Sequence, residues 1–89
     1  MIHYNLTIIG RVQGVGFRYS ALEKARQLGV VGYVSNMPDG AVYIEAEGTE
    51  EILGDFIAWC RQGPPVALVE EVKIDSQPVK GYQNFDVKH

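Results

Sequence analysis

The residues best suited to chemistry lie in the stretch RVQGVGFRYS, residues 11–20. Gly14 and Gly16 flank a valine there, and Arg18 follows at the point where a helix is expected to begin. Glycines adopt backbone conformations that other residues resist, so such a turn can aim successive N–H groups at one point. The helix behind it adds its own free N–H groups and the positive end of its dipole. The stretch therefore predicts a concave site for an anion such as phosphate.

Arg18 strengthens this hypothesis because its position is unfavourable for an arginine without an anionic partner. It shares a helix face with Ala21 and Ala25, the stripe expected to face a sheet, and it lies in the first turn, where a positive charge opposes the helix dipole. A guanidinium can bind two phosphate oxygens at once, so we expect an oxyanion beside it. Two alternatives remain: an ordinary strand-to-helix turn, since the loop matches no standard nucleotide-binding motif, and an arginine that reaches a surface carboxylate.

Asn36 is the second candidate for a functional side chain. It lies at the end of an expected strand, directly before the turn residues MPDG. It has the same strand parity as Gly32 and Val34, so neighbouring strands would bring it beside the glycine loop. The alternative is an asparagine that bonds its own backbone at the entry to a turn.

The elements that must position these residues follow from hydrophobic periodicity and from turn residues. We expect strands over residues 3–12, 30–36, 41–47 and 66–75 and around Phe85 and Val87, and helices over residues 17–28 and from the Thr49 cap to the GPP at 63–65. The order β-α-β-β-α-β plus a short C-terminal strand predicts an α+β fold, the ferredoxin-like α/β sandwich. Its mostly antiparallel sheet would carry two helices on one face and leave the other face, with Tyr43, Glu45 and Glu47, in solvent.

Composition limits the classes of function. A chain of 89 residues predicts one domain, residues 1–89, and a net charge of −3 argues against attraction to a nucleic acid. No apolar run approaches the ~20 residues of a membrane span, and the N-terminus has no signal-peptide pattern. Cys60 is the only cysteine and is expected to be a small buried hydrophobe. We expect a cytoplasmic monomer without nucleic-acid or membrane partners.

Three segments resemble the acylphosphatase family: GRVQGVGFR at 10–18, GYVSNMPDGAVYIEAEG at 32–48 and GPP at 63–65. They match in order and spacing over almost the whole chain. The resemblance implies the ferredoxin-like fold reached above. It also implies hydrolysis of the carboxyl-phosphate bond of small acyl phosphates, with no metal ion and no other cofactor.

The resemblance also implies roles for single residues. Arg18 matches the family's phosphate-binding arginine, and Asn36 matches the asparagine that positions the attacking water, so these two are the expected catalytic residues. The main chain of the expected phosphate-binding loop comprises Gln13, Gly14, Val15, Gly16, Phe17 and Arg18.

The candidate site residues include no histidine and no carboxylate, and His3 and His89, near the chain ends, are expected at the surface. The leaving group of an acyl phosphate is a carboxylate whose acid has a pKa of roughly 4, so it departs without a proton. The sparse site therefore suits this reaction, which needs a held phosphoryl group and a positioned water.

Two other functions remain open from the sequence. An acylphosphatase-like domain of a carbamoyl-transfer maturation protein would share GRVQGVGFR. An RNA-binding module of the same topology would need several aromatic side chains on the open sheet face and a basic surface. The acidic chain offers only Tyr43 as an outward aromatic on the 41–47 strand, which argues against RNA.

Overall fold

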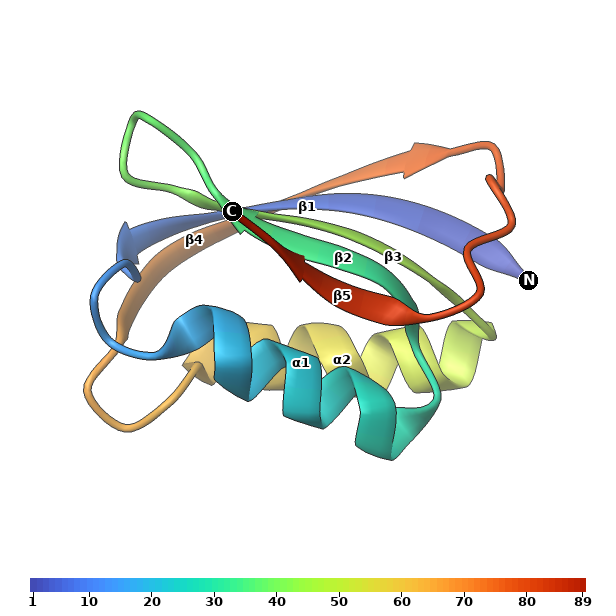
Figure 1. Cartoon of the computed structure of the whole chain (residues 1–89), viewed down its shortest axis with the longest axis horizontal. Helices are drawn as coiled ribbons and strands as arrows, with labels where there is room; N and C mark the ends of the chain where they lie inside the picture. The colour runs from blue at the N-terminus through green and yellow to red at the C-terminus, as the bar shows by residue number, and fades with distance from the viewer.

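The computed structural model describes all residues, 1–89, as one sheet with both helices packed on the same face (Figure 1). The elements are β1 (Ile2–Arg11), α1 (Phe17–Leu28), β2 (Val31–Asn36), β3 (Val42–Gly48), α2 (Glu50–Gln62), β4 (Leu68–Gln77) and β5 (Phe85–Lys88). The strand order is β4-β1-β3-β2-β5, and only the β2–β5 pair is parallel. The predicted ferredoxin-like sandwich, with a mostly antiparallel sheet, is confirmed.

Local signals account for most element boundaries. α1 spans the predicted residues and ends at Gly29, whose φ of 83° is the left-handed conformation typical of a helix end. Thr49 caps α2 as expected, because its Oγ1 accepts a hydrogen bond from Ile52 N at 3.3 Å. β4 begins two residues later than predicted, since Ala67 N donates to Pro64 O and the chain is still turning there.

The hydrophobic core fills the space between the sheet and the helices. Leu6, Ile8 and Ile44 from the sheet are fully buried against Ala21 of α1 and Phe56 of α2. Burial of each large apolar side chain stabilises the fold by about 1.5–3 kcal/mol, whereas small residues such as Ala21 let α1 approach the sheet closely. The core therefore fixes the position of α1, and with it the start of that helix.

Cys60 also lies in this core, as expected, with no exposed surface. Burial raises the pKa of its thiol, so it remains an unreactive hydrophobe.

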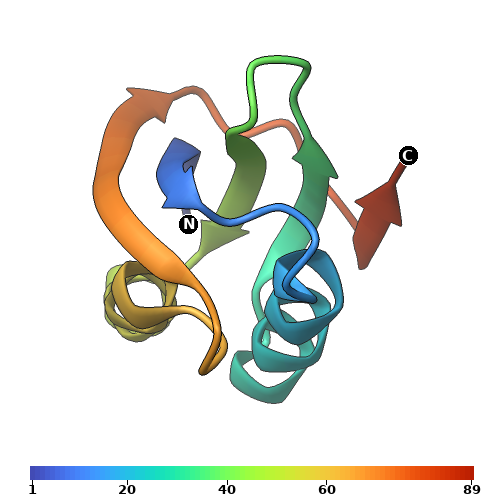
Figure 2. The ribbon, with the colours of Figure 1, turned by 90° about the vertical axis from the view of Figure 1, so that its left-hand side faces the viewer.

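Strand pairing brings the two candidate regions to one end of the sheet. β1 and β2 both pair antiparallel with β3, so they run in the same direction and their carboxyl ends meet at one edge. β1 leads into the glycine loop (residues 13–17), and β2 ends at Asn36, which pairs with Val42. Figure 2 views this edge and shows the blue connection from β1 to α1 close to the green β2–β3 hairpin. Asn36 therefore lies at the same edge of the sheet as the glycine loop, as predicted, although β1 and β2 are not neighbouring strands, because β3 lies between them.

The prediction of a solvated open face is wrong. The strap, residues 78–84 between β4 and β5, crosses that face and covers its polar side chains. Glu45 is 5% exposed, Glu47 is fully buried, and His3, expected at the surface, is 1% exposed. The two helices do share one face, but the opposite face carries a small buried polar cluster of its own.

Candidate active site

The glycine loop is built on two left-handed residues. Gly14 has a φ of 73° and Gly16 a φ of 79°, and Gly16 is the N-cap of α1. A Cβ atom added at either position would meet no other atom within 4 Å, so backbone conformation rather than crowding requires glycine. An ordinary L-residue in this conformation costs roughly 1–2 kcal/mol. The two glycines therefore allow a specific loop conformation directly before α1.

The loop and the first turn of α1 present unpaired main-chain donors. None of the N–H groups of residues 13–19 donates a hydrogen bond within the protein; the first to do so is Ser20 N, to Gly16 O at 3.1 Å. No side chain caps α1, and its first turn contains no acidic residue. These donors therefore lie at the positive end of the helix dipole and are suited to an anion.

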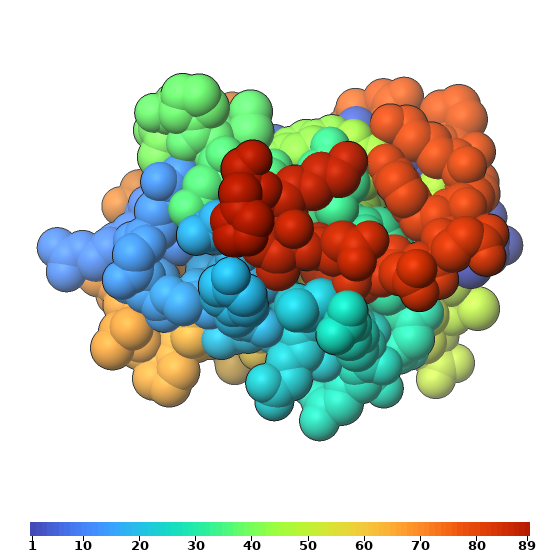
Figure 3. Space-filling model, viewed as in Figure 1, coloured from blue at the N-terminus to red at the C-terminus, as the bar shows by residue number.

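Arg18 adds a cationic side chain at the same place. Its Nη1 donates to Nδ1 of His89 at 3.1 Å, and no Asp or Glu oxygen forms an ion pair with it. Figure 3 shows the red C-terminal segment, which ends at His89, packed over the molecule beside the blue start of α1. The alternative of an arginine reaching a surface carboxylate is wrong. His89 is exposed, as expected.

Asn36 has an unpaired carboxamide. Its Oδ1 is buried and has no hydrogen-bond partner, and the side chain makes no hydrogen bond to its own backbone, so the Asx-turn alternative is wrong. A buried acceptor without a partner costs about 1–3 kcal/mol, and such a group in a folded protein usually has a functional reason.

These features converge on one cavity. It has a volume of about 170 Å³ and is lined by Val12, Gly14, Gly16, Phe17, Arg18, Tyr19 and Asn36. The structure thus brings Arg18, Asn36 and both glycines together, as the sequence predicted. Gln13 and Val15, which also belong to the expected phosphate-binding loop, are not among the residues that line the cavity.

Two features of this region were missed from the sequence. Tyr19 lines the cavity and is 58% exposed, and its place next to Arg18 in the first turn of α1 was the available signal. Gln13 turns its side chain toward the β2–β3 hairpin, where Nε2 donates to Met37 O at 2.8 Å and Ala41 O at 2.9 Å. No local pattern indicates that contact.

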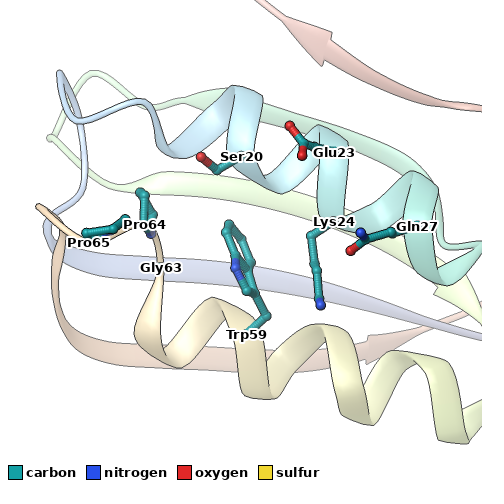
Figure 4. Close-up of a pocket in the computed structure, with 8 residues that line it drawn as sticks. All are labelled: Ser20, Glu23, Lys24, Gln27, Trp59, Gly63, Pro64 and Pro65. Atoms are coloured by element: carbon teal, nitrogen blue, oxygen red, sulfur yellow. The ribbon is translucent and has the colours of Figure 1, made fainter.

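A wider hollow of about 330 Å³ lies between the helices (Figure 4). Trp59 rises from α2 toward α1, opposite polar side chains of α1 that include Lys24 and Gln27. Unlike the cavity at Asn36, the hollow contains no buried polar atom without a partner, and the N–H group of Gly63 in its lining loop already donates to Trp59 O. It therefore offers less for catalysis.

The polar cluster on the open face is saturated with hydrogen bonds. Glu47 accepts from His3 Nδ1 at 2.7 Å and from the main-chain N–H groups of Lys80, Gly81 and Tyr82. Burial alone would raise the pKa of Glu47, but these hydrogen bonds outweigh it and lower the pKa. No group of three or more His, Cys, Asp or Glu side chains is arranged to hold a metal ion.

Glu45 is held in the same way. It accepts from the hydroxyls of Tyr33, Tyr43 and Tyr82 and from Nζ of Lys80. Its burial opposes ionisation, yet these donors lower its pKa to about 2. Burial and the neighbouring carboxylate raise the pKa values of the three phenols, so they remain donors at neutral pH.

Comparison with known proteins adds an independent observation. The model of the family described as Acylphosphatase matches residues 4–87. A protein named Acylphosphatase from Nostoc sp. is 44% identical over 88 residues, which cover 99% of this chain and 87% of the relative. The crystal structure of acylphosphatase from Bacillus subtilis superposes with a TM-score of 0.97 at 34% identity, over 100% of both chains.

One larger protein also contains a similar fold. The structure of full-length HypF matches with a TM-score of 0.88 at 28% identity and covers 99% of this chain but 12% of the HypF chain. Neither helix of the present chain has the length and the apolar run needed to span a membrane.

Proposed function

The chain belongs to the acylphosphatase family and is an enzyme that hydrolyses acyl phosphates; we propose that the cavity at the glycine loop performs this reaction. The observation that carries the proposal is the meeting of three kinds of polar group in one cavity, none of which has a carboxylate partner. These are the N–H groups of the loop, the guanidinium of Arg18 and the buried carboxamide of Asn36.

In this proposal the phosphoryl group is bound by the glycine loop and by Arg18. The main-chain N–H groups of residues 13–18 donate to its oxygens, and the Arg18 guanidinium donates two further hydrogen bonds. Each charge-assisted hydrogen bond contributes about 1.5–3 kcal/mol, so four or five of them bind a phosphate without a positive net charge on the protein. The same donors stabilise the negative charge on the equatorial oxygens in the transition state.

Asn36 positions the attacking water. A carboxamide both donates and accepts hydrogen bonds, so it can fix the orientation of a water as well as its place. The buried and unpaired Oδ1 supports this role, because a water held there would give it the partner that it lacks. The side chain lies in the same cavity as the loop glycines, as an attack on a bound phosphoryl group requires.

The reaction needs no general acid, because a carboxylate leaves without a proton. Phosphoryl transfer has a loose transition state, so the water requires positioning more than deprotonation, and a phosphate oxygen of the substrate accepts its proton. A phosphate monoester releases a more basic alkoxide or phenoxide and is therefore a poor substrate for this site.

Further parts of the proposal concern the setting of the enzyme. We expect residues 1–89 to function as a single domain and a monomer in the cytoplasm, on small acyl phosphates and without nucleic acid as a partner. The buried free thiol of Cys60 and the net charge of −3 support this setting. The alternative, a domain of a carbamoyl-transfer maturation protein, rests on the HypF match, which has lower identity than the match to the Nostoc protein.

The test compares two aryl substrates that differ in their leaving group. We expect rapid hydrolysis of an aryl acyl phosphate and no measurable hydrolysis of the corresponding aryl phosphate monoester, without added metal and in the presence of a chelator. Equal turnover of both substrates, or loss of activity on chelation, would contradict the proposal.

A further inference from the structure

The side chain of Gln13 joins the glycine loop to the hairpin that follows Asn36. Its Nε2 donates to Met37 O at 2.8 Å and to Ala41 O at 2.9 Å, so both amide hydrogens are used. No other hydrogen bond connects residues 12–19 with residues 36–41. One glutamine therefore provides the whole polar connection between the two halves of the cavity.

The two acceptors lie at the base of the turn between β2 and β3. Met37 N donates to Ala41 O at 2.8 Å, and Gly40 N donates to Met37 O at 3.1 Å, so the turn is closed by its own main chain. Gln13 binds this closed turn at both of its ends. A shift of Gln13 would therefore be transmitted to Met37 and to its neighbour, Asn36.

No hydrogen bond within the protein holds the side chain of Asn36 in place. Its carboxamide makes no hydrogen bond in the protein, so its place in the cavity depends on the main chain that carries it. Because displacement of a reacting group by about 1 Å can lower a rate about a hundredfold, that dependence has a large effect on catalysis.

We propose that the Gln13 side chain is a positioning residue, which sets the distance between the bound phosphoryl group and the water held by Asn36. This inference rests on the proposed function of the cavity. It assigns to the side chain of Gln13 a role separate from the one proposed for its main-chain N–H group, which is to donate to the phosphoryl oxygens. Glutamine suits the task because its NH₂ group supplies two donors to two carbonyl oxygens, whereas a glutamate at neutral pH has only acceptors.

The test uses Gln13→Met, which keeps the length of the side chain and removes both donors. We expect kcat to fall between about tenfold and a hundredfold, while the inhibition constant of inorganic phosphate changes less than about threefold. The matched control is Gln62→Met, at an exposed glutamine of α2 whose side chain makes no hydrogen bond, and it should leave both values unchanged.

A double-mutant cycle separates this role from a general structural one. In the Asn36→Ala background the further loss from Gln13→Met should be less than about twofold, because the residue through which Gln13 acts is already gone. Independently of activity, amide hydrogen exchange at Met37 and Gly40 should accelerate in Gln13→Met, since the turn loses its external anchor.

The outcomes are distinguishable. Wild-type kcat in Gln13→Met, unchanged exchange at Met37 and Gly40, or a phosphate affinity that falls as much as kcat would overturn this inference alone. An equal loss of kcat from Gln13→Met in the wild-type and Asn36→Ala backgrounds would also overturn this inference alone. Full turnover by Asn36→Ala would instead overturn the proposed role of Asn36, and this inference with it.

Discussion

The cavity at the glycine loop and the polar cluster beneath the strap differ in whether their polar groups have hydrogen-bond partners. In the cavity, the N–H groups of residues 13–19 and the Oδ1 of Asn36 have no partner in the protein. In the cluster, Glu45 and Glu47 each accept four hydrogen bonds. Unpaired groups are available to a ligand, whereas saturated groups fix the fold.

This difference separates catalysis from stability. Unsatisfied groups destabilise the folded state, and a small domain tolerates them only where other interactions compensate. The cluster clamps the strap over the sheet, and the strap leads into β5, whose far end places His89 against Arg18. We therefore expect substitutions in the cavity to change catalysis with little effect on stability, and substitutions in the cluster to do the reverse.

Replacement of Arg18 gives the largest expected effect. Arg18→Ala removes the cationic donor of the cavity, and we expect turnover to fall about 10³- to 10⁵-fold, with binding of inorganic phosphate lost as well. The free energy of unfolding should change little, because the only hydrogen bond lost is the exposed one to His89. Steady-state kinetics, phosphate titration and urea unfolding measure these three quantities.

The control for this prediction is Arg61→Ala, at an exposed arginine in the last turn of α2. It should retain both turnover and phosphate affinity. The contrary outcome is that Arg18→Ala unfolds at a much lower urea concentration while the folded variant still binds phosphate. Arg18 would then stabilise the fold instead of binding the anion, and the contrast with the cluster would disappear.

Asn36→Ala should separate binding from turnover. We expect kcat to fall about 10²- to 10³-fold with phosphate affinity nearly unchanged, because the side chain positions the water and not the phosphoryl group. The free energy of unfolding should stay the same or rise, since the substitution removes a buried acceptor without a partner. The control is Asn84→Ala at an exposed position of the strap; equal losses of binding in Asn36→Ala and Arg18→Ala would refute the division of roles.

Replacement of Glu47 tests the opposite region. Glu47→Gln leaves four donors facing one acceptor oxygen and a second amide group, and we expect the free energy of unfolding to fall by about 3 kcal/mol. The kcat of the folded fraction should remain that of the wild type. Glu71→Gln, at an exposed position of β4, is the matched control. A loss of kcat without loss of stability would show that the cluster belongs to the catalytic apparatus.

The cavity was predictable from the sequence because its signals are local. Two glycines, an arginine in a first turn and an asparagine before a turn lie in two short segments, and strand order alone brings those segments together. The α1 boundaries were correct for the same reason. The side-chain contact of Gln13 was not predictable, because it depends on where a hairpin 24 to 28 residues away comes to lie.

The polar cluster could not be predicted for a related reason. Alternation along β3 correctly placed Glu45 and Glu47 on the face away from the helices, and period-2 patterns say no more than that. Their burial results from the strap, whose polar residues read as an ordinary connection in the sequence. Whether a loop lies across a sheet face depends on long-range contacts, here between His3 and Glu47 and between Glu47 and Gly81.

The smallest expected effect is a dependence of stability on acidity that arises in the cluster alone. The pKa of Glu45 is lowered from 4.5 to about 2, because hydrogen bonds from Tyr82, Lys80 and other donors outweigh its burial. A carboxyl group with a depressed pKa in the folded state stabilises the protein fully above its unfolded pKa, and this contribution is lost as the pH falls through the folded value. Urea unfolding should therefore show a loss on the order of 2 kcal/mol from Glu45 as the pH falls from 4.5 toward 2.

Glu45→Gln provides the comparison that assigns this pH dependence of the free energy of unfolding to Glu45. The variant should be less stable at neutral pH and should lose less stability on acidification, because position 45 no longer titrates. The remaining dependence of stability on pH then belongs to Glu47, whose pKa is also lowered. Since no Asp or Glu side chain lines the cavity, phosphate affinity at a pH where the protein stays folded should be the same in the variant and the wild type. Parallel stability curves for the two proteins would mean that the hydrogen bonds to Glu45 do not hold its charge, and the cluster would then lose its role as the acid-sensitive clamp of the strap.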